Sequence, residues 1–113
     1  MNNPLNSSID SIIFELNFSD VPVNTVKVLS NDNLSIIVAN LNNEFYAVEN
    51  VCSHQKVPLN STQIVNDEEI ECQKHGARFN LKTGKQVCLP AVKPIKAYCV
   101  KTVQDKVLIC EKS

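Results

Sequence analysis

The chain of 113 residues contains no Trp, only two Gly and a single Arg, and it has no apolar stretch as long as a membrane-spanning helix. Its first ten residues carry no positive side chain and no apolar run of the length found in signal peptides. One Arg is also too few for an Arg-rich transit peptide. These absences argue against the usual membrane and export signals, and we expect a cytoplasmic protein.

Strong charge of one sign is absent as well, because the formal net charge is −1 at pH 7. The sequence therefore gives no reason to expect binding to nucleic acid or to a membrane surface. The charge is nevertheless unevenly divided: residues 1–50 hold six acidic residues and one Lys, so residues 51–113 carry a net charge of +4. Such a positive half can steer acidic partners, and a mixed, solvated surface is the alternative interpretation.

No segment of twelve residues shows the apolar periodicity of an amphipathic helix, and no internal repeat or interdomain linker is evident. Short runs rich in Val, Ile and Phe are instead separated by Asn, Asp, Ser and Pro, which predicts strands joined by turns. The predicted strands are residues 11–16, 25–29, 35–39, 45–48, 62–65, 69–71, 78–81, 93–102 and 106–110, and the predicted turns are residues 31–33, 42–43, 66–67, 82–84 and 104–105. The sequence thus predicts an all-β fold, an antiparallel β-sandwich or small barrel. Residues 9–113 would form its single domain, after a flexible N-terminus at residues 1–8.

Two short motifs, Cys52-Ser53-His54 and Cys72-Gln73-Lys74-His75, each contain one Cys and one His, with 17 residues between His54 and Cys72. Matched Cys and His pairs are typical of metal sites. Zinc sites usually pair Cys with Cys and His with His along the chain, whereas a Rieske iron–sulfur centre takes two Cys on one iron and two His on the other. The mixed order therefore favours a 2Fe–2S cluster with Cys52 and Cys72 on one iron and with His54 and His75 on the other.

A structural zinc site with the same four ligands is the alternative to the cluster, and colour separates the two, because a zinc protein is colourless and a Rieske protein is red-brown. The remaining cysteines are not placed to be ligands. Five is an odd number, which fits thiols and metal ligands better than a set of disulfides. Cys99 and Cys110 lie in runs rich in Val and Ile, so we expect them to be small buried hydrophobic residues. Cys88 is expected to pack near the metal site.

Residues 45–95 resemble the Rieske ferredoxins that feed electrons to bacterial ring-hydroxylating oxygenases. The similar stretches are residues 48–54, 72–80, 83–85 and 88–91. The resemblance implies a Rieske-type fold with two cluster-binding loops at one end. It also implies a soluble, monomeric one-electron carrier, not an enzyme, that passes electrons from a flavin-dependent reductase to a terminal oxygenase. A small accessory subunit of a nitrite-reductase type is the alternative, since such subunits share the fold, although they often lack the ligands.

Four positions differ from respiratory Rieske proteins in ways that affect the expected redox potential. Those proteins carry a disulfide between the ligand loops, where this chain has Val57 and Lys74. They also donate hydroxyl hydrogen bonds to the cluster, where this chain has Ala77 and Phe79. Hydrogen bonds to the sulfurs raise the potential. We therefore expect a potential in the lower part of the Rieske range of roughly −150 to +300 mV.

The second motif departs from the ferredoxin pattern, because Gln73 and Lys74 replace a Pro and an apolar residue. Gly76 is expected to let the loop pass close to a sulfide, and Pro90 resembles the Pro of the loop that covers the cluster. Because the two His are implied to lie near the surface, partners are expected to dock there. Lys56 and Lys74 would attract an acidic surface, and exposed, solvated lysines are the alternative interpretation.

Overall fold

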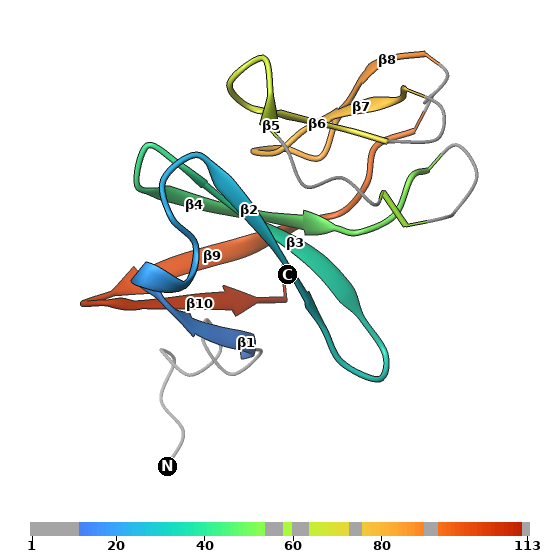
Figure 1. Cartoon of the computed structure of the whole chain (residues 1–113). Helices are drawn as coiled ribbons and strands as arrows, with labels where there is room; N and C mark the ends of the chain where they lie inside the picture. Colours follow the sequence, from blue (N-terminus) through green and yellow to red (C-terminus); the bar gives the residue numbers. More distant parts are fainter. Residues whose placement is uncertain (1–11, 54–57, 60–63, 73–75, 90–92, 112–113) are drawn as a thin grey trace.

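The computed structural model describes residues 12–53, 58–59, 64–72, 76–89 and 93–111. The expected flexible N-terminus at residues 1–8 lies outside these ranges. Within them the chain is nearly all β, as predicted (Figure 1), and no helix is long and apolar enough to span a membrane. The elements are β1 (Ile12–Asn17), the 3₁₀ helix η1 (Phe18–Asp20), β2 (Thr25–Ser30), β3 (Ser35–Leu41), β4 (Glu44–Glu49), β5 (Ile64–Val65), β6 (Glu69–Glu71), β7 (Arg78–Asn80), β8 (Gln86–Cys88), β9 (Ala97–Val103) and β10 (Lys106–Cys110).

The strands form two antiparallel sheets. The larger one has the order β1-β10-β9-β4-β3-β2 and curls into a half-barrel, and the smaller one has the order β5-β6-β7-β8 and lies beside it (Figure 1). The chain enters the small sheet after β4 and returns to the large sheet at β9. The small sheet and its connections are therefore one insertion between two neighbouring strands, since β4 pairs with β9.

Strand β3 is buried on both of its faces, which places it at the centre of the molecule. Side chains alternate between the two faces of a strand. Ile36 and Val38 belong to a core cluster inside the half-barrel, together with residues of β1, β4, β9 and β10. Ile37 and Ala39 belong to a second cluster, which also contains Phe79 of the small sheet. The second cluster thus joins the two sheets.

The predicted Asn-rich turns are confirmed, and their backbone shows why Asn and Asp occur there. Asn42 and Asn43 have φ values of 57° and 71°, and Asn66 and Asp67 have values of 49° and 70°. Two consecutive positive φ values are the mark of the type I′ turn, which suits a two-residue hairpin, and Asn and Asp tolerate them better than most residues. The Asn42-Asn43 turn is the two-residue connection between β3 and β4, whereas Asn66 and Asp67 begin a three-residue connection between β5 and β6.

Strand prediction was wrong in two places. Strand β8 was not predicted, because its three residues are too few to show an alternating pattern. Strand β9 begins at Ala97 and not at residue 93. The reason is that the Ile95 N–H donates to the carbonyl oxygen of Gly84 (2.8 Å), so the segment before β9 is bound to the turn after β7.

Candidate metal centre

Cys52 and Cys72, the two cysteines of the Cys/His motifs, are brought into the same part of the molecule. Cys52 follows β4 by three residues, and Cys72 directly follows β6. Both are buried, with 0% and 1% of their surface exposed, and both belong to the core cluster that joins the two sheets. Residues 54–57 and 73–75, which contain both histidines, lie outside the described residues.

Two backbone hydrogen bonds close the loop that contains the second motif. The Cys72 N–H donates to the carbonyl oxygen of Ala77 (2.7 Å), and the Gly76 N–H donates to the carbonyl oxygen of Cys72 (2.9 Å). Gly76 has a φ of 74°, a region that side chains rarely adopt. A Cβ at Gly76 would meet only a Glu71 carboxylate oxygen, at an ordinary 3.6 Å. Among the described contacts, the backbone conformation is therefore what favours glycine here.

Asn50 joins the two ends of the first motif's loop. Its side-chain amide donates to the Ser35 hydroxyl (3.1 Å) at the start of β3, and its side-chain oxygen accepts from the Leu59 N–H (3.1 Å). One side chain therefore holds the approach to Cys52 and the return of the loop at residue 59. Sequence analysis missed this role, and the available signal was an Asn placed directly between a strand and a ligand motif.

A third segment, from β8 to the start of β9, contacts both ligand loops. The Cys88 thiol lies 3.6 Å from the Gly76 carbonyl oxygen, a weak S–H hydrogen bond that places Cys88 beside the second ligand loop. The Ser53 hydroxyl donates to the Lys93 carbonyl oxygen (2.6 Å). Pro90 itself lies outside the described residues. The segment is thus tied to the first loop at one point and to the second loop at another.

The two cysteines supply two thiols that a metal centre could use. Two thiols are buried beside the apolar side chains of Leu59, Ala77 and Phe79, at the ends of two loops that hydrogen bonds hold closed. In the part of the chain that the structure describes, no group of three or more Cys, His, Asp or Glu could hold a metal ion. Further ligands would therefore have to come from the undescribed residues of these loops, where both histidines occur.

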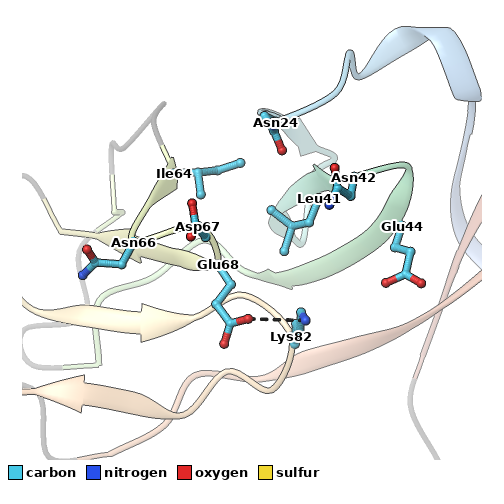
Figure 2. Close-up of a pocket in the computed structure, with 9 residues that line it drawn as sticks. All are labelled: Asn24, Leu41, Asn42, Glu44, Ile64, Asn66, Asp67, Glu68 and Lys82. Atoms are coloured by element: carbon cyan, nitrogen blue, oxygen red, sulfur yellow. Dashed lines mark ion pairs between the residues drawn. The ribbon is translucent and has the colours of Figure 1, made fainter.

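A polar pocket of about 630 Å³ lies beside the β3–β4 and β5–β6 turns (Figure 2). It is lined by Asn24, Leu41, Asn42, Glu44, Ile64, Asn66, Asp67, Glu68 and Lys82. Its wall contains an ion pair between Lys82 Nζ and Glu68 Oε1 (3.3 Å). Hydrogen bonds from Asn80 and then Lys82 lower the pKa of Glu68, and the bond to Glu68 raises the pKa of Lys82. Because β4 and β6 run from this end toward Cys52 and Cys72, the pocket is not part of the metal centre.

Relatives in sequence are ferredoxin subunits of dioxygenases. Over 65 residues the chain is 42% identical to the 3-phenylpropionate/cinnamic acid dioxygenase ferredoxin subunit of Escherichia coli (strain K12). This match covers 58% of the chain, and it spans only 61% of the length of that relative.

Solved structures and a family comparison agree with these relatives. The ferredoxin of carbazole 1,9a-dioxygenase from Nocardioides aromaticivorans IC177 is 26% identical, with a TM-score of 0.81 over 90% of this chain and 99% of that one. A chain of a complex of reduced oxygenase and oxidized ferredoxin in carbazole 1,9a-dioxygenase is 27% identical, with a TM-score of 0.77 over 88% of this chain and 95% of that one. The sequence model of the Rieske 2Fe-2S domain matches residues 13–99, and the chain therefore belongs to the Rieske 2Fe–2S family.

Proposed function

We propose that this chain is a one-electron carrier that takes electrons from a flavin-dependent reductase and passes them to a terminal oxygenase. Membership of the Rieske family and the names of the relatives support this role. The observation that carries it is that Cys52 and Cys72 are buried in the same hydrophobic core, each at the end of a loop that hydrogen bonds close. An electron carrier needs a cofactor site and no substrate site, so the chain is not itself an enzyme.

We assign four ligands to the cluster. Cys52 and Cys72 would supply thiolates to one iron, and His54 and His75 would supply imidazoles to the other. When bound, the cluster accepts and releases one electron. The described residues exclude water on the inner side, because Leu59, Ala77 and Phe79 are fully buried around the two cysteines. Electron exchange with partners would then take place on the histidine side.

We place residues 9–113 in a single domain of a monomeric cytoplasmic protein. The odd number of cysteines, five, supports the location, because it fits thiols and metal ligands better than a set of disulfides. Structural disulfides are typical of oxidising compartments, and thiols persist in reducing ones.

Metal content and electron transfer together test the proposed function. Protein produced with added iron is expected to be red-brown, to hold two irons and two acid-labile sulfides per chain, and to take up one electron. Mixing the reduced protein with the terminal oxygenase of the same host should reoxidise it. Stoichiometric zinc in a colourless protein would support the zinc alternative. A cluster that reduces normally but reacts only within a tight complex with a reductase would support the accessory-subunit alternative.

The redox potential is expected to lie in the lower part of the range of roughly −150 to +300 mV. Ala77 and Phe79 are fully buried beside the cluster-binding cysteines and carry no hydroxyl group. Phe79→Tyr should raise the potential by on the order of 40 mV, which is what one net hydrogen bond of about 1 kcal/mol gives a one-electron couple. Voltammetry at neutral pH measures both values. A native potential well above zero would show that other groups tune the cluster.

The docking surface expected around His54, Lys56, Lys74 and His75 falls on undescribed residues. Leu89 is described, and it belongs to the segment that contacts the second ligand loop at Gly76. Leu89 directly follows Cys88, which contacts the second ligand loop, and 75% of its surface is exposed. Such exposure suits an apolar anchor that a partner covers.

Leu89→Ala is therefore expected to lower the second-order rate of electron transfer to the oxygenase by roughly tenfold, the size of an interface anchor worth more than 1 kcal/mol. Val103→Ala is the matched control, because Val103 is 52% exposed but lies at the β9–β10 turn. Stopped-flow kinetics across a salt series, with Lys56→Gln plus Lys74→Gln as a third variant, separates apolar from charged contributions. Equal rates for Leu89→Ala and Val103→Ala would place the docking surface elsewhere.

A further inference from the structure

Cys99 and Cys110, which the proposed function does not use, lie directly opposite each other on neighbouring strands. In the antiparallel register of β9 and β10, Cys110 pairs with Cys99. Opposite residues of an antiparallel pair point to the same face, and their Cα atoms are about 4.5–5.5 Å apart. A disulfide requires a Cα separation of roughly 4.4–6.8 Å. The backbone therefore holds the two Cα atoms at a separation that a disulfide can span. The Cβ atoms of such pairs are about 4.5–5.5 Å apart and would have to approach by roughly 1 Å for the bond to form.

The surroundings of the pair give the two thiols different access to solvent. Cys110 is buried, with 2% of its surface exposed, whereas Cys99 is only partly buried. Burial raises the pKa of the Cys110 thiol, the nearby Cys99 raises it further, and Lys101 lowers it. Cys99 is thus the thiol that a small oxidant reaches first, and Cys110 is the neighbour that can react next.

We propose that Cys99 and Cys110 form an oxidation site that converts a hydroperoxide into a cross-strand disulfide. The Cys99 thiolate attacks one peroxide oxygen, so that an S–O bond forms, the O–O bond breaks, and hydroxide leaves and is protonated to water. The Cys110 sulfur then attacks the sulfur of the Cys99 sulfenic acid, an S–S bond forms, and a second water leaves with the Cys110 proton. With hydrogen peroxide, two thiols lose two electrons and two waters are formed.

The disulfide would fasten β10 to β9 without involving the cluster ligands. Cys52 and Cys72 belong to the hydrophobic core between the two sheets, and neither Cys99 nor Cys110 belongs to it. A cross-link between residues already paired in the native sheet acts mainly by restricting the unfolded chain. Oxidation is therefore expected to raise the melting temperature of the domain by roughly 10 °C, and the rise should disappear with a thiol reductant.

Peptide mapping of the whole cluster-loaded protein tests the proposal directly. After treatment with a small excess of hydrogen peroxide, the denatured protein is alkylated and digested with trypsin. Cleavage after Lys96, Lys101, Lys106 and Lys112 releases Cys99 and Cys110 in two short peptides, residues 97–101 and 107–112. We expect these two peptides to appear joined, with a mass two hydrogen atoms below their sum. The untreated protein should give them separately and alkylated.

Two variants complete the experiment. Cys99→Ser, at the more exposed position, should abolish both the linked peptide and the rise in melting temperature. Cys88→Ser should keep both, which shows that the pairing is specific. The proposal is overturned if both peptides remain alkylated after oxidation, if Cys99 is converted to a sulfinic acid, or if Cys99 instead links two chains into a dimer on a non-reducing gel.

Discussion

Replacing Cys72 with Ser is expected to abolish the cluster, with loss of nearly all iron and of the visible absorption. A serine hydroxyl is a hard oxygen ligand, whereas iron–sulfur clusters select soft thiolates. A water molecule could not replace the lost ligand, because Cys72 is only 1% exposed and is surrounded by apolar core side chains. Iron analysis and the visible spectrum of protein made with added iron measure the effect.

Cys99→Ser is the matched control for this change. It also replaces a thiol by a hydroxyl, but at a position outside the hydrophobic core between the two sheets. It should retain the full iron content. Far-ultraviolet circular dichroism of both variants distinguishes loss of the cluster from loss of the fold, because metal binding can be coupled to folding. Full iron occupancy in a folded Cys72→Ser protein would contradict the ligand assignment.

The fold class could be predicted from the sequence because its signals are local. Runs such as Ser35–Leu41 are rich in β-branched residues, and pairs such as Asn42-Asn43 suit the positive φ values of tight hairpins. What the sequence could not show is that β3 is buried on both faces. That burial arises only because a second sheet, built from short strands distant in sequence, covers one face of the first.

The candidate site also has a part that the sequence predicts and a part that it does not. The two motifs carry their chemistry in residue type and spacing, so Cys52 and Cys72 could be proposed as ligands without a structure. The supports of the site could not, because they depend on partners far away in sequence: Asn50 bonds Ser35, and Ser53 bonds Lys93 across 40 residues. A single Asn or Ser beside a motif looks like any loop residue until its partner is known.

Gly84 shows the same limit most clearly, because the sequence predicts only a turn and the structure adds a close backbone contact. Its φ is 79°, and a Cβ at this position would lie 2.1 Å from the Ile95 carbonyl oxygen and 3.1 Å from its carbon. These are backbone atoms, held by the hydrogen bond from the Ile95 N–H to Gly84 (2.8 Å), so they cannot move aside as a flexible side chain could. Glycine is therefore required both for the backbone conformation and for the space.

Gly84→Ala is accordingly expected to lower the free energy of unfolding by about 3–5 kcal/mol, through backbone strain and a forced separation of the two segments. Gly76→Ala is the matched control. Its φ of 74° is almost the same, but among the described residues a Cβ there would meet only a Glu71 side-chain oxygen, at an ordinary 3.6 Å. The control should therefore show mainly the conformational penalty, about 1–2 kcal/mol. Its iron content is measured alongside, because Gly76 directly follows the proposed ligand His75. Denaturant titrations followed by circular dichroism measure both differences.

The Gly84 substitution should also reach the metal centre, because the segment pushed away from Gly84 includes Lys93, whose carbonyl oxygen binds the Ser53 hydroxyl between two proposed ligands. Iron release to a chelator is therefore expected to be faster in Gly84→Ala than in the native protein under conditions where both remain folded. If Gly84→Ala and Gly76→Ala lose the same stability, the approach of Ile95 to Gly84 is not a tight contact. If iron release is unchanged while stability falls, the segment before β9 does not support the first ligand loop.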